Sequence, residues 1–183
     1  YGELQPDLRI DDSLCGGKLR LEISLKKALP QRYGLQKMQV HRLRLTDIRE
    51  LDMEQAVGQF PEAEYISMSG NPGIVTHMQA AGELSGLRSL SCKDLFGYGA
   101  KDMEALEGLN ELRELDFDSA PREAGLYLKK HWKGRLDRLS VAHLRDEGWL
   151  RDNLENPLRH WDGSEFIPKA AYRSARKCYQ DTK

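Results

Sequence analysis

Acidic residues alternate with apolar residues in the stretch LRELDFDSA, residues 112–120. The acidic residues are Glu114, Asp116 and Asp118, and the apolar residues between them are Leu115 and Phe117. In a β-strand the acids lie on one face and the apolar residues on the other. Carboxylates can act as a catalytic acid and base where they flank a pocket. Three acids on one face of a strand do not by themselves predict such a pocket. An isolated strand does not explain Leu112 or Ala120, so the stretch belongs to a longer pattern.

Histidines are the other candidates for chemistry, and they are spread along the chain. They are His41, His77, His131, His143 and His160. None has a second histidine or a cysteine at metal-ligand spacing. His160 and Asp162 can face the same way in an extended segment, but no nucleophile accompanies them. The sequence also lacks G-x-S-x-G, H-E-x-x-H and a phosphate-binding loop. We therefore predict a protein that is not an enzyme and has no cofactor and no metal.

The composition bounds the remaining classes of protein. The 183 residues carry a formal net charge of -1, with 31% charged and 39% hydrophobic residues. This balance indicates one globular domain without a general attraction to nucleic acid or membranes. No apolar run approaches the ~18 residues that cross a bilayer. Cys15, Cys92 and Cys178 are far apart, which argues against a disulfide framework or a zinc ribbon. We predict a cytoplasmic monomer with Cys92 in its core.

The spacing of LRELDFDSA recurs along the chain. A template with apolar residues at the first, fourth and sixth positions, and an apolar residue or Asn at the ninth, fits five windows well and a sixth less well. The windows are VHRLRLTDI (40–48), AEYISMSGN (63–71), LRSLSCKDL (87–95), LRELDFDSA (112–120), LDRLSVAHL (136–144) and LRHWDGSEF (158–166). Their starts are 23, 24, 25, 24 and 22 residues apart, and the segments that they open are numbered units 1 to 6. A unit this short must bury its apolar side on its neighbours.

This period and pattern resemble those of leucine-rich repeat proteins over residues 40–166. The resemblance implies an α/β solenoid with a curved parallel sheet on its concave side and helices on its convex side. The chain is then a single domain of 1–183, with an N-terminal cap and edge strand in 1–39, the repeats in 40–166 and a capping helix in 167–183. The stretch WDGSEFIPKAAYRSARK resembles the C-terminal caps of small uncharacterised bacterial leucine-rich repeat proteins.

Helical spacing of apolar residues predicts a helix after each strand. The expected helices lie at 52–60, 75–84, 101–109, 124–132 and 146–154. Asp52 and Asp102 are expected as N-caps or first-turn acids. Left-handed exits are expected at Gly58, Gly82, Gly108 and Gly134. The alternation in KLRLEISL (18–25) predicts a strand at the N-terminal edge of the same sheet, covered by residues 1–17 or by a domain outside the chain.

The register of the units places the third, fifth and seventh positions on the concave face. The partner-binding residues predicted there are Arg42, Arg44, Tyr65, Ser67, Ser89, Ser91, Lys93, Glu114, Asp116, Asp118, Arg138 and His160. This face is basic in unit 1, small and polar in units 2 and 3, and acidic in unit 4. Tyr65 is the expected anchor, because an aromatic on a polar face often dominates an interface.

A purely structural interpretation stands beside this one. Cross-strand ion pairs on the face would contribute a few tenths of a kcal/mol and keep the surface soluble. The expected pairs are Glu114 with Arg138 and Lys93 with Asp118. Asp116 has no basic neighbour at its own level, and Tyr65 would pack on an arginine of unit 1.

We expect a non-catalytic protein–protein interaction module that binds a partner through its concave face. The alternative is the substrate-recognition domain of a larger enzyme, such as a bacterial effector resembling the leucine-rich repeat ubiquitin ligases, which the start at Tyr1 permits. A domain without a dedicated site is the third interpretation. Nucleic-acid binding is disfavoured by the near-neutral charge and the mixed face.

Overall fold

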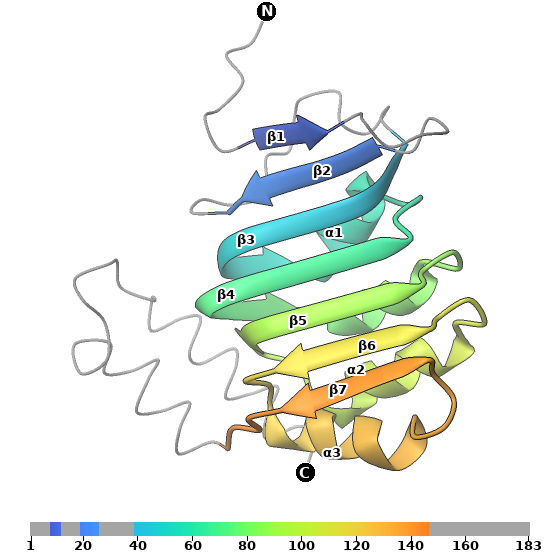
Figure 1. The fold of residues 1–183 in the computed structure, drawn as a ribbon. Coiled ribbons are helices and arrows are strands. Elements are labelled where there is room, and N and C mark those ends of the chain that lie inside the picture. The colour runs from blue at the N-terminus through green and yellow to red at the C-terminus, as the bar shows by residue number, and fades with distance from the viewer. Residues whose placement is uncertain (1–7, 12–18, 26–38, 147–183) are drawn as a thin grey trace, which may run out of the picture.

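The computed structural model of the chain describes residues 8–11, 19–25 and 39–146 (Figure 1). Its elements are β1 (Leu8–Asp11), β2 (Leu19–Ser24), β3 (Val40–Asp52), α1 (Met53–Gln59), β4 (Tyr65–Thr76), η2 (Met78–Glu83), β5 (Ser89–Phe96), α2 (Ala100–Glu104), η3 (Ala105–Gly108), β6 (Glu114–Asp118), α3 (Arg122–His131) and β7 (Arg138–Ala142). Units 1 to 4 therefore each supply one strand followed by helix. None of the helices in these ranges combines the length and the apolar character that crossing a membrane requires.

The strands form one sheet whose spatial order is the order of the sequence, β1 to β7. Strands β2 to β7 pair in parallel, and β1 pairs antiparallel with the outer side of β2. The strand predicted at 18–25 is confirmed as β2. Its expected place at the edge is wrong, because Leu8–Asp11 lies outside it. The first of the two expected covers, a segment within 1–17, is therefore present, and it satisfies backbone groups that β2 would otherwise expose.

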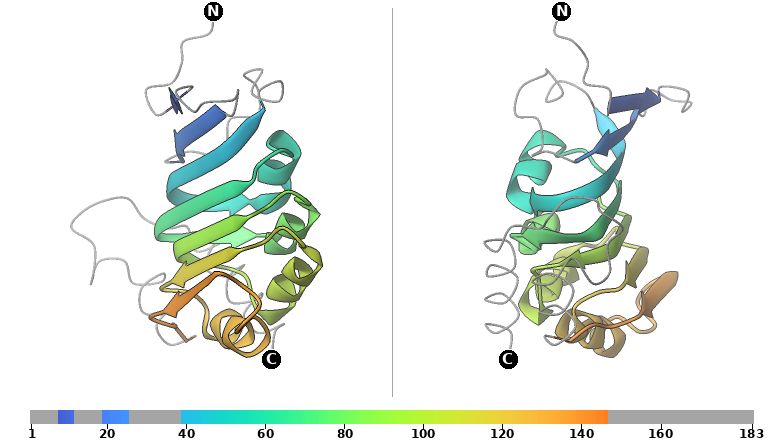
Figure 2. Two further views of the ribbon diagram at one scale, coloured as in Figure 1. Left: turned by 45° about the vertical axis from the view of Figure 1, so that its right-hand side comes forward. Right: turned by 90° about the vertical axis from the view of Figure 1, so that its left-hand side faces the viewer.

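The described helices lie on one face of the sheet. In Figure 1 the strands lie in front and the helices behind them, and the turned views of Figure 2 show the two layers from the side. Parallel strands need a crossover between them, and each crossover from β3 to β7 passes through this helical layer. The fold class is thus α/β with a parallel sheet. The opposite face of the sheet carries no described helix.

Side chains at the template positions build the core between the two layers. In units 1, 3 and 4 all four positions are buried: Val40, Leu43, Leu45 and Ile48; Leu87, Leu90, Cys92 and Leu95; Leu112, Leu115, Phe117 and Ala120. Leu112 and Ala120 therefore close the two ends of the core layer behind β6, which explains their spacing. In unit 2 the ninth residue, Asn71, is exposed, and the buried residue Ile74 lies opposite Phe96 of β5. Each fully buried Leu or Phe contributes about 1.5–3 kcal/mol.

The backbone takes a left-handed turn at the eighth position of four units, and β3 and β5 continue through it. Asp47, Asp94, Ser119 and His143 occupy this position, and their φ angles lie between 46° and 53°. Left-handed backbone is uncommon for residues other than glycine, and Asp and His tolerate it better than most. The turn sends the ninth side chain back into the core. The apolar pattern does not reveal this turn, because the turning residue is polar.

Two expected helices are shorter than predicted. Over 75–84, β4 continues to Thr76 and the 3₁₀ helix η2 follows; over 101–109, α2 gives way to η3 after five residues. A unit leaves few residues between the turn and the next strand, so packing against the neighbouring unit overrides helical spacing. Asp52 is confirmed as an N-cap, since it accepts a hydrogen bond from the Glu54 amide at 3.0 Å. Asp102 accepts one from the Gly99 amide at 2.8 Å.

Of the four glycines expected in left-handed backbone, only Gly134 has a positive φ, 82°. Gly58 lies inside α1, and Gly82 and Gly108 lie inside 3₁₀ helices. These three helices end through ordinary backbone at the following residues, so the expected exits there are wrong. The reason is again the short crossover, which carries the chain directly toward the next strand.

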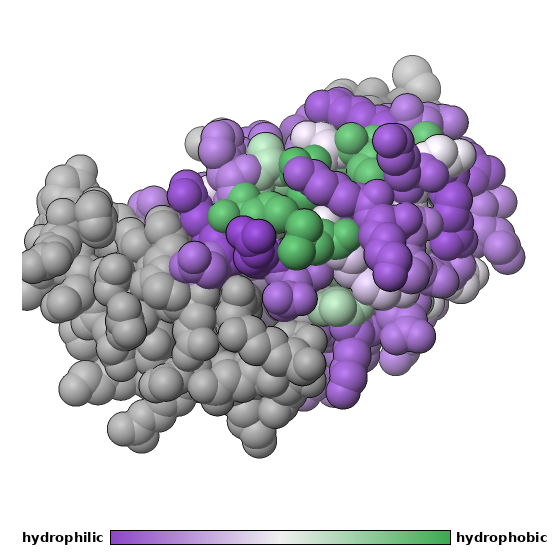
Figure 3. All heavy atoms as spheres, turned by 90° about the horizontal axis from the view of Figure 1, so that it is seen from below, coloured by the Kyte–Doolittle hydropathy of each residue, from purple (hydrophilic) through white to green (hydrophobic). Residues whose placement is uncertain are grey.

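Burial decreases in unit 5, at the end of the described sheet. Its apolar residues Leu136, Leu139, Val141 and Leu144 are only partly buried, although they pack on the core. Figure 3 looks onto this end of the molecule and shows an apolar strip among polar side chains. The expectations for unit 6, for most of the helix at 146–154, for the capping helix at 167–183 and for His160 lie outside the described residues.

Candidate binding face

The side chains at the third, fifth and seventh positions share one face of the sheet, which we call the open face. The register aligns them in rows across the strands. The first row is Arg20, Arg42, Tyr65, Ser89, Glu114 and Arg138; the second is Glu22, Arg44, Ser67, Ser91, Asp116 and Ser140. The third contains Ser69, Lys93, Asp118 and Ala142. The structure thus brings together every predicted binding residue except His160.

Tyr65 stands near the middle of this face and contacts unit 1. The guanidinium carbon of Arg42 lies 4.4 Å from the centre of the Tyr65 ring. An arginine over an aromatic face gains about 0.5–1 kcal/mol where the pair is exposed. The expected packing of Tyr65 on an arginine is confirmed. It also holds the Arg42 side chain in one orientation.

A hollow of about 260 Å³ opens beside Tyr65. We call it the arginine hollow, and it is lined by Arg20, Arg42, Leu43, Arg44, Tyr65, Ile66, Ser67, Ser89 and Ser91. Its charged groups are guanidinium groups, and its other polar groups are hydroxyls. The lining therefore offers many hydrogen-bond donors to an anionic or polar group.

The sequence did not single out Arg20 as a binding residue. Arg20 and Glu22 come from β2, which precedes unit 1, so the repeat template does not include them. Parallel pairing places Arg20 opposite Arg42 and Glu22 opposite Arg44. The alternation in KLRLEISL was the available signal, because it puts both side chains on the polar side of the strand.

The acids of unit 4 are engaged differently from the prediction. Lys93 lies opposite Asp118 and serines flank Asp116, as expected, but Nζ of Lys93 reaches diagonally to Asp116 at 3.9 Å. Glu114 accepts a hydrogen bond from the Ser89 hydroxyl at 3.2 Å. A lysine side chain is longer than the spacing between strands, and it can reach a neighbour that register alone does not place beside it. The nitrogen–oxygen separation and the exposure of Lys93 make this pair weak.

Asp118 instead pairs with His143, which follows β7. Nδ1 of His143 lies 2.7 Å from Oδ1 of Asp118. This hydrogen bond holds the pKa of the Asp118 carboxyl below its ordinary value. A related contact joins Ser24 to Asp47 at 2.7 Å on the N-terminal side. In both cases a seventh-position side chain, or its equivalent on β2, bonds the turning residue of the next unit.

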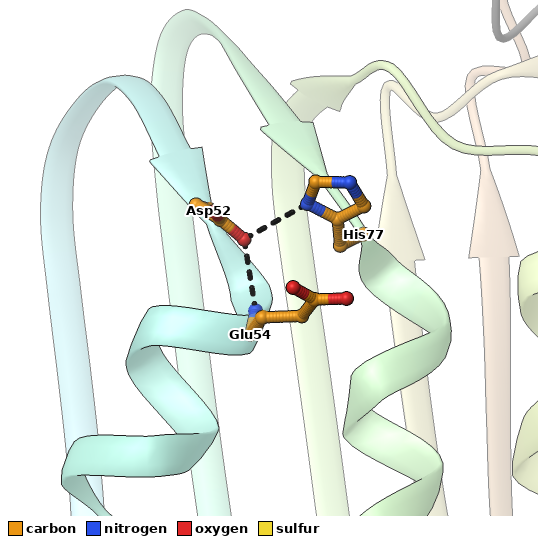
Figure 4. A group of neighbouring side chains, drawn as sticks. All are labelled: Asp52, Glu54 and His77. Atoms are coloured by element: carbon orange, nitrogen blue, oxygen red, sulfur yellow. Dashed lines mark hydrogen bonds and ion pairs between the residues drawn. The ribbon is translucent and has the colours of Figure 1, made fainter.

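A second polar group lies where β3 leads into α1 and β4 leads into η2 (Figure 4). Asp52, Glu54 and His77 each offer one ligand atom, and these atoms lie within 4.8 Å of one another. Oδ1 of Asp52 already accepts from the Glu54 amide and lies 3.0 Å from Nδ1 of His77. The hydrogen bond to Asp52 raises the pKa of His77. Capping of α1 accounts for the placement of Asp52 in this group.

Cys92 belongs to β5, and its side chain is buried in the core, as predicted. Desolvation raises the pKa of its thiol well above the ordinary value, so the nucleophilic thiolate is disfavoured. This cysteine is therefore a core residue that packs in the place taken by Phe117 in the next unit.

No protein-family model, curated protein or solved structure matches this chain in the three comparisons with known proteins.

Proposed function

We propose that the chain is a leucine-rich repeat domain that binds a partner protein, without catalysis, through the concave side of a solenoid. The open face is this concave side. The observation that carries the proposal is the composition of the open face: an aromatic anchor lies beside a hollow, with arginines on one flank and carboxylates on the other.

Three properties of the open face support binding of a protein. Tyr65 is half-buried and is held by Arg42, so little side-chain entropy is lost when it is covered. The polar groups of the face point outward from a rigid parallel sheet, which fixes their spacing. Charges of opposite sign at its two ends favour one orientation of a partner over the reverse.

The test is capture of partners from a lysate of the native source by the wild-type chain and by two charge-swapped variants. The variant Arg44→Glu/Asp116→Lys exchanges two charges of the open face. The control Glu104→Lys/Lys130→Glu makes the same exchange on the exposed helical side, in α2 and α3. We expect a protein that is captured by the wild type and the control and lost by the open-face variant.

Circular dichroism verifies that both variants fold. Capture that survives in the open-face variant and is lost in the control would place binding on the helical side and contradict the proposal. Replacement of Tyr65 provides a second test of the proposal. Tyr65→Ala should weaken binding of the captured partner about tenfold or more, because interface aromatics of this kind often contribute 2 kcal/mol or more.

A further inference from the structure

The arginines of the arginine hollow lie close together and outnumber the carboxylates opposite them in the sheet. Arg20 and Arg42 lie directly opposite each other on β2 and β3. Like charges at such positions destabilise a sheet. Among the side chains that the structure describes, neither has a carboxylate within ion-pair distance, and Arg44 has only Glu22, at 3.9 Å. In the backbone register, Asp11 of β1 lies opposite Arg20.

Two arginines elsewhere on the described surface do have carboxylates within ion-pair distance. Arg88 lies 3.9 Å from Glu64 and 3.8 Å from Glu111. Arg135 lies 3.9 Å from Glu107. The hollow therefore keeps an excess of positive charge in a protein whose net charge is -1. This excess costs stability unless an anion from outside joins the group.

The geometry of the hollow suits an oxyanion. Its guanidinium groups come from two neighbouring strands, and Ser67 and Ser91 supply hydroxyls from β4 and β5, while the Ser89 hydroxyl donates to Glu114. Arg42 is held in place by its contact with the Tyr65 ring, so its donors are oriented before a ligand arrives. Guanidinium forks bind phosphate through paired, charge-assisted hydrogen bonds.

We propose that the arginine hollow binds the phosphate of a phosphorylated side chain on an extended segment of the partner protein. This inference rests on the proposed function, because it names what the open face recognises. A phosphate monoester carries about -1.5 to -2 charges near neutral pH and three acceptor oxygens. Its three oxygens offer the three guanidinium groups more acceptors, and more negative charge, than the two oxygens of a carboxylate side chain. Phosphorylated segments are commonly recognised by clusters of arginines.

The direct test is a titration of the ¹⁵N-labelled protein with three short Gly-Ser peptides that differ at one residue. The central residue is phosphoserine, glutamate or serine. We expect the phosphoserine peptide to shift the amide signals of Arg42, Arg44 and Ser67, with an affinity at least about tenfold above that of the glutamate peptide. Equal affinities of the two charged peptides, or shifts located elsewhere, would overturn the proposal.

Two variants connect this binding to the arginines. Arg42→Gln should lower the affinity for the phosphoserine peptide about tenfold or more. Its melting temperature should change little, because the loss of the contact with Tyr65 is offset by relief of the repulsion from Arg20. The control Arg122→Gln removes an exposed arginine of α3 and should leave the affinity unchanged. Equal losses in the two variants would indicate attraction to net charge alone and would overturn the proposal.

Phosphatase treatment of the lysate separates this inference from the proposed function. Capture that is lost after treatment, and lost in Arg42→Gln, supports both. Capture that resists the phosphatase but still depends on Arg44 and Asp116 leaves the interaction module standing and overturns the phosphate site. A single-stranded oligonucleotide that displaces the phosphoserine peptide at equal affinity would overturn the assignment to a protein segment.

Discussion

Each histidine in the described part of the chain contacts a carboxylate of a neighbouring unit. The pairs are His41 with Glu64, His77 with Asp52, His131 with Glu107 and His143 with Asp118. These residues are remote in sequence and adjacent only because the units stack. Most of the pairs are exposed, so each contributes little to stability, although each favours the native stacking.

The pair of His77 and Asp52 predicts a pH dependence. The raised pKa of folded His77 means that protonation stabilises the folded state. This contribution is fully present below the ordinary pKa of 6.5 and is lost as the pH rises through the folded pKa. In urea unfolding, the free energy of unfolding of the wild type should exceed that of His77→Gln, and the difference should be larger at about pH 5.5 than at about pH 8.5. The Asp52→Asn background keeps an N-cap and should abolish this difference; its persistence there would contradict the assignment to Asp52.

Removal of a buried hydroxyl, that of Tyr98, is expected to stabilise the protein. The Tyr98 hydroxyl is buried and has no hydrogen-bond partner in the described structure, while its ring meets Phe117 edge-on at a centroid distance of 6.0 Å. Burial without a partner costs free energy that a phenyl ring avoids. Tyr98→Phe should therefore raise the free energy of unfolding by about 1 kcal/mol in urea titration. A clear loss of stability would show that the hydroxyl is bonded.

At the scale of the elements, a glycine in β4 allows β3 and β4 to approach closely. A Cβ atom at Gly73 would collide with the carbonyl oxygen of Ile48 in β3. Both atoms belong to backbone, so neither can move aside without shifting a strand. A Cβ atom at Gly58, in α1, would meet nothing within 4 Å. The two glycines look alike in the sequence, but their surroundings differ.

Alanine substitution at these glycines should act in opposite directions. Gly73→Ala should lower the free energy of unfolding by about 1–3 kcal/mol, because the close approach of β3 and β4 is blocked. Gly58→Ala should raise it by about 0.5–1 kcal/mol, because alanine favours helix and loses less entropy on folding. Chemical unfolding of both variants beside the wild type measures the difference. Equal effects would mean that the close approach does not exist in solution.

For the whole molecule, burial is deepest in the middle of the sheet. Core side chains of units 3 and 4 are almost completely buried, whereas those of unit 5 are partly exposed and β1 contributes only four residues. Each unit is stabilised by the units beside it, so local opening should begin at the ends of the described sheet. Amide hydrogen exchange should be slowest in β4, β5 and β6 and fastest in β1 and β7. Uniform protection would indicate that the sheet opens only as one cooperative unit.

The sequence determined the features that repeat with a local period. Alternation within a strand fixes which side chains face the core, and the constant spacing of the units fixes which residues share a row. For this reason the core positions of β3, β5 and β6 and the rows through Tyr65 and Asp116 follow from the sequence.

Only the tertiary structure decided the features that depend on approach between distant segments. The antiparallel addition of β1, the reach of Lys93 to Asp116 and the turn at Asp47 do not follow from any period. The arginine hollow belongs to the same group, because Arg20 precedes the repeats and meets Arg42 only through strand pairing. The physical reason is that a pattern fixes the face on which a side chain lies, whereas packing fixes its neighbours and conformation.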